Sequence, residues 1–197
     1  NANFMLQNYK SYIFNFLKNT MEKINYKIDH SNNNLKAYNN SDTLKYKASW
    51  FLEFGKTTSE IYNLENEIIY TITKKFKFWK WRMSYNISPK NKESLVLISS
   101  NTANSVFKLQ LDTDIYEVQI HYFQKQSIFK NGVKIAEIND AFAESFEENT
   151  SNVLLLNSED LEITFLLYTC LKTGMINQKS VIKSQKELIS LKEKWGS

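Results

Sequence analysis

Basic and aromatic side chains alternate between Lys74 and Met83, in the stretch KKFKFWKWRM. It holds four lysines, one arginine and two tryptophans, and no acidic residue. Lysines attract phosphate groups, and tryptophans favour the interface between a bilayer and water. We therefore expect a site for anionic lipid headgroups here, with the candidate residues Lys74, Lys75, Lys77, Trp79, Lys80, Trp81 and Arg82.

Two other interpretations of this stretch stay open. It can be an ordinary hairpin with its rings in the core and its lysines in water, or a groove in which rings stack on single-stranded nucleic acid. Arg82 is the only arginine of the chain, and lysine is the poorer reader of bases, which argues against nucleic acid. Strict alternation mixes charges and rings on both faces, so we expect a bulge or a turn near Phe78.

Residues that could support catalysis or hold a metal are few. The chain has one cysteine, Cys170, and two histidines, His30 and His121, which excludes a zinc site with several Cys or His ligands. No Walker loop, dinucleotide-binding glycine pattern or nucleophile elbow is present. We expect no enzymatic activity and no cofactor, although a hydrolase using Asp and Glu stays a third hypothesis. Cys170 is expected in the core, and each histidine is expected to be a structural or a surface residue.

A long series of strands must position the basic and aromatic stretch. From about residue 25 to 156 the apolar period is two, and the dipeptide Asn131–Gly132 predicts a type I′ turn. This pattern predicts antiparallel pairing in a sandwich or a barrel. The predicted strands cover 26–29, 34–38, 43–46, 49–53, 59–63, 68–73, 78–87, 95–99, 105–111, 116–122, 127–130, 133–138 and 153–156.

The period changes to that of a helix over residues 157–173. Asn157 or Ser158 can cap this helix, and its apolar residues cover nearly the whole circumference. Such a helix must be buried on all sides, and it is too short to span a bilayer. The lumen of a closed barrel is the simplest place for it. Glu162 then lies at the barrel mouth, or it needs a lysine or backbone partner inside.

Two amphipathic helices are predicted at the termini, over 1–23 and 178–195. Either can pack on the barrel, on another subunit or on a membrane. With the strands over 25–156 they complete a single domain, 1–197. The chain has no long apolar run and no signal-peptide pattern, and its lone cysteine favours the cytoplasm, with peripheral contact to a membrane.

Three segments resemble the tubby C-terminal-like superfamily, which includes phospholipid scramblases and LURP-one-related proteins. The turn 62–67 with strand 68–73 is similar to the family's turn and hydrophobic strand, although Asn66 or Glu67 replaces the turn glycine. Residues 74–87 are similar to its basic, aromatic hairpin, and residues 157–171 to its threading helix. The resemblance covers about 25–174 and implies a closed barrel of about twelve strands with a hydrophobic helix through its centre.

Two functions follow as hypotheses. The first is a non-enzymatic binding or scaffold module whose partner is an anionic membrane surface or a protein. The second is a carrier of a small apolar ligand, of lipocalin type, which requires an empty lumen. The sequence does not identify the partner or the oligomeric state.

Overall fold

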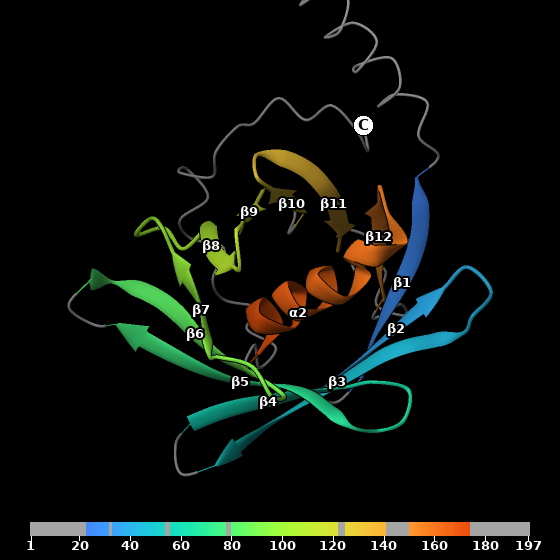
Figure 1. Ribbon diagram of the computed structural model, residues 1–197, viewed down its shortest axis with the longest axis horizontal. Coiled ribbons are helices and arrows are strands. Elements are labelled where there is room, and N and C mark those ends of the chain that lie inside the picture. Colours follow the sequence, from blue (N-terminus) through green and yellow to red (C-terminus); the bar gives the residue numbers. More distant parts are fainter. Residues whose placement is uncertain are drawn as a thin grey trace, which may run out of the picture.

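The strands of the protein close into one barrel. The computed structural model describes residues 23–31, 33–53, 56–77, 80–121, 125–140 and 150–173. Each strand pairs with its neighbours along the chain in antiparallel fashion, and β1 pairs with β12 (Figure 1). The twelve strands are β1 (Ile24–Ser31), β2 (Asn34–Asn39), β3 (Leu44–Glu53), β4 (Lys56–Tyr62), β5 (Ile68–Lys77), β6 (Arg82–Pro89), β7 (Leu95–Ser99), β8 (Val106–Leu111), β9 (Asp114–Ile120), β10 (Gln126–Lys130), β11 (Val133–Asn139) and β12 (Thr150–Leu155).

The predicted antiparallel barrel is therefore confirmed, with corrections to single strands. The segments 43–46 and 49–53 form one strand, β3, because Lys45 and Lys47 alternate with inward residues and do not form a turn. The predicted strand 78–87 begins later, at Arg82, which pairs with Lys77 across the β5–β6 hairpin, while Phe78 itself lies outside the described residues. The Asn131–Gly132 turn has φ angles of 49° and 78°, as a type I′ turn requires.

One helix follows the last strand. A 3-10 turn, η4 (Ser158–Asp160), leads into α2 (Leu161–Lys172), and the side chain of Asn157 accepts the N–H of Glu159 at 3.1 Å. Ten residues of α2 are buried, and its apolar side chains share one core cluster with inward residues of the strands, such as Ile28 and Ile72. Figure 1 shows α2 within the ring of labelled strands. The helices predicted over 1–23 and 178–195 lie, apart from Lys23, outside the described residues.

The barrel has two distinct ends. Because neighbouring strands are antiparallel, the odd-numbered strands all run toward one end and the even-numbered strands toward the other. Helix α2 starts after β12 and runs in the direction of the odd-numbered strands. We call the end where α2 begins the N-end and the end where it finishes the C-end.

We expect Leu167→Ala to lower the free energy of unfolding by about 2–5 kcal/mol, because the truncation leaves a cavity in a core that cannot collapse fully. Leu167 is fully buried. The measurement is equilibrium urea unfolding, with Leu64→Ala as the matched control, since Leu64 is 57% exposed. Equal losses for the two variants would contradict burial of α2.

Candidate functional sites at the two ends of the barrel

The N-end is marked by a carboxylate with two tyrosine partners. The hydroxyl of Tyr46 donates to Glu162 at 3.2 Å, and the hydroxyl of Tyr70 donates to its other oxygen at 2.6 Å. Burial and the nearby carboxylate raise the pKa of Tyr46 to about 12 and also raise the pKa of Tyr70, so both remain donors. Glu162 is exposed, so it lies at the mouth as one sequence interpretation expected, with tyrosine partners.

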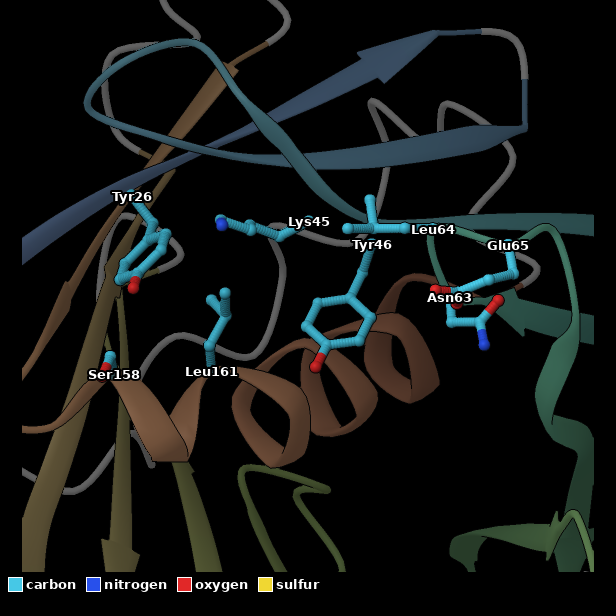
Figure 2. A pocket seen from close by; sticks show the side chains of 8 residues that line it. All are labelled: Tyr26, Lys45, Tyr46, Asn63, Leu64, Glu65, Ser158 and Leu161. Carbon is cyan, nitrogen blue, oxygen red and sulfur yellow. The ribbon is translucent and has the colours of Figure 1, made fainter.

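A hollow of about 360 Å³ lies beside this carboxylate (Figure 2). Side chains of both charge signs, Lys45 and Glu65, line it together with Tyr26 and Tyr46. A second hollow, of about 340 Å³, includes Phe129 in its lining. Within the described ranges, no group of three or more His, Cys, Asp or Glu residues could hold a metal ion.

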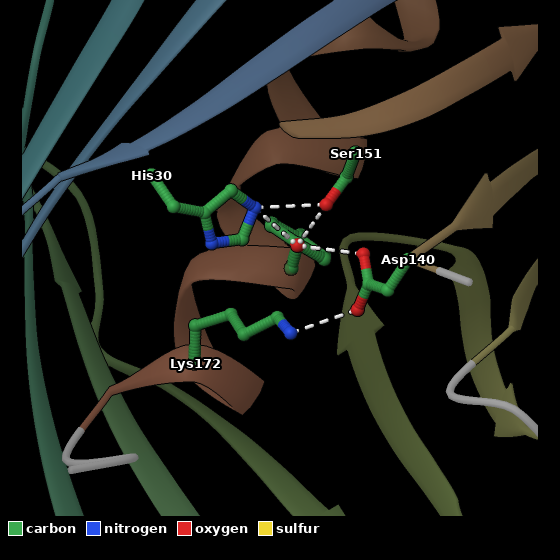
Figure 3. A network of polar contacts seen from close by, with 5 residues as sticks. His30, Asp140, Ser151 and Lys172 are labelled. Carbon is green, nitrogen blue, oxygen red and sulfur yellow. Dashed lines mark hydrogen bonds and ion pairs between the residues drawn. The ribbon is translucent and has the colours of Figure 1, made fainter. Parts of the chain in front are cut away.

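A buried polar network occupies the C-end (Figure 3). The Tyr168 hydroxyl lies 2.7 Å from Ser151 Oγ, 2.9 Å from His30 Nε2 and 2.9 Å from Asp140 Oδ1. Lys172 Nζ lies 2.8 Å from the other oxygen of Asp140. These residues come from β1, β12, α2 and the end of β11, so the network ties the last turns of the helix to three strands.

The proton positions in this network follow from simple counting. Asp140 is ion-paired with Lys172 and only accepts, so Tyr168 gives its single proton to Asp140. The two remaining partners of the Tyr168 oxygen must then donate. This assigns the hydrogen of neutral His30 to Nε2 and turns the Ser151 hydroxyl toward Tyr168. The single Nε2 hydrogen is then shared between the oxygens of Tyr168 and Ser151, which lie 2.9 Å and 2.8 Å away.

The environment keeps His30 neutral. Burial and the charge of Lys172 lower the pKa of His30 to about 4, against the opposing effect of Asp140 and Asp29. The contact between Ser151 and His30, at 2.8 Å, has the spacing of a nucleophile and its base. Ser151 is nevertheless buried, its hydroxyl is committed to Tyr168, and it lines neither hollow. The network therefore supports a structural role for His30, one of the two roles expected from the sequence.

Lys74, on β5, contacts the end of the helix. Its ammonium donates to the backbone carbonyl of Thr173 at 3.1 Å, while the hydroxyl of Ser59 lies 2.6 Å from the hydroxyl of Thr173. Burial lowers the pKa of Lys74. A cation beside the last carbonyls of a helix also stabilises the helix dipole. Lys74 therefore faces inward, away from the exposed lysines with which the sequence analysis had placed it.

The other predicted site residues gather at the hairpin formed by β5 and β6, as far as the described residues extend. Lys75, Lys80 and Trp81 are exposed, and Arg82 is half-buried. The side chains of Lys77 and Trp79 lie outside the described part. Phe76, which the sequence analysis did not include in the site, is 46% exposed and contacts Trp81 edge to face, with ring centroids 6.1 Å apart.

The turn of this hairpin holds Trp81 in an unusual conformation. Its φ of 49° lies in the left-handed region, which is strained for a bulky side chain. The side chain of Asn104 bridges to it, accepting the N–H of Met83 at 2.8 Å and donating to the carbonyl of Trp81 at 3.4 Å. The turn therefore keeps a 62% exposed indole outside the core. Strain of this kind is found where the surroundings enforce it, often at functional positions.

Two further features were missed by the sequence analysis. Phe51 and Leu52 are exposed near the tip of the neighbouring hairpin, where the run Phe51–Leu52 breaks the period of two. That break in the alternation was the signal in the sequence that could have identified these exposed apolar residues. The C-end network offers no local signal, because His30 and Tyr168 are 138 positions apart.

We expect stability to fall as the pH drops from about 6.5 to about 4. In this window the unfolded chain binds a proton at His30 and the folded chain does not, so unfolding is favoured by about 1.4 kcal/mol per pH unit. Urea unfolding across this range should show that His30→Gln reduces the slope by about one proton, because its amide can donate as Nε2 does but does not titrate. Parallel curves for the two proteins would contradict the lowered pKa.

The described part of the chain contains no helix that is long and apolar enough to cross a bilayer. No family model and no curated protein matches the sequence. The fold, however, resembles the X-ray structure of a protein from Arabidopsis thaliana, with a TM-score of 0.51 and 11% sequence identity. The match covers 77% of this chain and 91% of that one. At this identity the similarity supports the barrel fold alone.

Proposed function

We propose that this protein is a non-enzymatic module that binds anionic membrane surfaces through the β5–β6 hairpin. The observation that carries the proposal is the hairpin tip, where the exposed rings of Phe76 and Trp81 touch each other beside the exposed Lys75 and Lys80. Lysines near an anionic leaflet each contribute about 1 kcal/mol, and an indole suits the headgroup region. The proposal places the protein in the cytoplasm, on an anionic leaflet.

The interior of the barrel supports binding on the outside. A carrier of lipocalin type needs an empty lumen, but the side chains of α2 and those of the strands share one buried cluster. Figure 1 draws α2 within the ring of labelled strands. This observation argues against the carrier and favours a surface site.

The family assignment is part of the same proposal. We infer a distant relationship to the tubby C-terminal-like superfamily, with α2 as its threading hydrophobic helix. Twelve strands closed by the β1–β12 pair, a single described helix after the last strand and the Arabidopsis fold likeness support this inference. The superfamily's scramblases and tubby domains are associated with lipid, which agrees with a membrane partner.

The experiment is flotation with vesicles of phosphatidylcholine, with and without phosphatidylserine. We expect binding only to vesicles that contain phosphatidylserine, and we expect Lys75→Glu/Lys80→Glu to weaken it by at least about 30-fold, since two cations are reversed. Lys74 is not used, because it holds the end of α2 and its loss would disturb the fold.

The matched control is Lys36→Glu/Lys92→Glu, which makes the same change in net charge at two exposed lysines away from the hairpin tip. It should retain most of the binding. An equal loss of binding in both double variants would show that binding depends on net charge and not on the hairpin site. Unchanged binding of Lys75→Glu/Lys80→Glu would refute the assigned site.

A further inference from the structure

Two hairpin tips project side by side from the C-end. Strands β4 and β5 are paired, with Thr58 opposite Thr73. The last described pair of each hairpin, Glu53 with Lys56 and Lys77 with Arg82, lies beyond this pair on the same side. The tips of β3–β4 and β5–β6 are therefore neighbours at one end of the barrel.

Large exposed apolar side chains gather on these two tips. Leu52 is 72% exposed and Phe51 is 39% exposed on the first tip, while Trp81 and Phe76 extend the apolar surface on the second. The other exposed large apolar residues of the described chain lie near the N-end, spread over the starts of β5, β7, β9 and β11 and the turn before β5, at Leu64, Ile68, Val96, Ile115 and Val133. Apolar surface concentrated in this way marks an interaction site.

The strand alternation explains why these side chains are open to solvent. Along β5, every second residue faces inward: Ile72 is fully buried, and Lys74 meets the last carbonyl of the helical segment at Thr173. Phe76 is the next inward position, but the helix has already ended. On β3, Trp50 packs against the core and Leu52 is the next inward position. The tips therefore extend the core face of the sheet beyond the helix that covers it.

The charge around this rim identifies the kind of partner. Apart from the inward-facing Lys74, the stretches 51–56 and 74–83 carry five Lys or Arg residues and one acid, Glu53. An anionic surface matches this excess. The chain's own C-terminal stretch 178–195 does not, because it holds five lysines and only two glutamates and so repeats the sign of the rim.

We propose that the two tips act as one insertion rim, which buries Leu52 and Trp81 in the interfacial region of an anionic bilayer while the surrounding lysines contact headgroups. The inference rests on the proposed function and deepens it. The hairpin β3–β4 becomes a second arm of the site, and the barrel is oriented with its C-end toward the membrane. Binding then has an apolar component in addition to the electrostatic one.

Site-specific labelling tests the insertion directly. A Leu52→Cys variant is labelled with the fluorophore NBD, and Leu64→Cys, at the N-end, is the matched control. Native Cys170 is fully buried and burial raises the pKa of its thiol, so it should not react. With phosphatidylserine vesicles we expect a blue shift and quenching by doxyl-labelled lipid for the label at Leu52 and neither for the label at Leu64.

A second measurement keeps the test independent of labelling. Leu52→Ser should bind the same vesicles about tenfold more weakly than the parent protein, both at low salt and at about 0.5 M KCl, because salt screens the charges that the two proteins share and leaves the apolar contribution in place.

The outcomes separate the two proposals. Binding that depends on Lys75 and Lys80, with no quenching at Leu52 and no weakening by Leu52→Ser at either salt concentration, would overturn the insertion rim and leave the headgroup site standing. No binding to anionic vesicles at all would overturn both. If Leu52→Ser instead converts a dimer to a monomer in sedimentation, the rim is an interface between two copies and the insertion is refuted.

Discussion

The apolar circumference of α2 is the constraint on which the structure depends. A helix packed on an open sheet covers one stripe of its surface and leaves the rest in water. Ten of the twelve residues of α2 are buried, which only surfaces on every side can achieve. Closure of the sheet provides them, and the same closure removes the free edges that would otherwise invite pairing with other chains. A single requirement thus accounts for both the helix and the barrel.

Burial of a helix creates a second problem, since its ends and its polar side chains must still be satisfied in a dry interior. At the start, Asn157 caps the first turn and Glu162 reaches the mouth, where two tyrosines donate to it. At the finish, Lys74 and Ser59 meet Thr173. The Tyr168 hydroxyl, fully enclosed, needs the chain of partners that ends in the Asp140–Lys172 pair. Loss of one member leaves a buried charge or hydroxyl unpaired, which costs more than the pair itself contributes.

How far the sequence predicts this arrangement depends on the range of each interaction. The strands and the Asn131–Gly132 turn follow from local patterns, and so does the burial expected for residues 157–173. The joining of β1 to β12 does not, and neither does the meeting of His30 with Tyr168, because no spacing along the chain encodes them. Lys74 shows the same limit. Alternation along the strand places it on the same face as Ile72. Whether the helix covers it depends on the length of the helix relative to the strand, and α2 ends beside Lys74 but before Phe76.

This difference in length makes the two ends of the barrel unequal. At the N-end, the acidic residues that open the helix and the two tyrosines that donate to Glu162 surround the start of α2 with polar groups. At the C-end, the hairpins β3–β4 and β5–β6 extend beyond the end of α2, so the inward face of their strands is exposed there. The side chains of α2 and of the strands share one buried cluster, and close packing of this kind makes the barrel a rigid support for the two tips. In folded domains, binding residues are often found on loops that such a scaffold positions. The turn at Trp81 agrees with this separation between a packed core and exposed tips. Its backbone is held in a strained conformation by Asn104, and the exposed indole gains no core packing that would offset the strain.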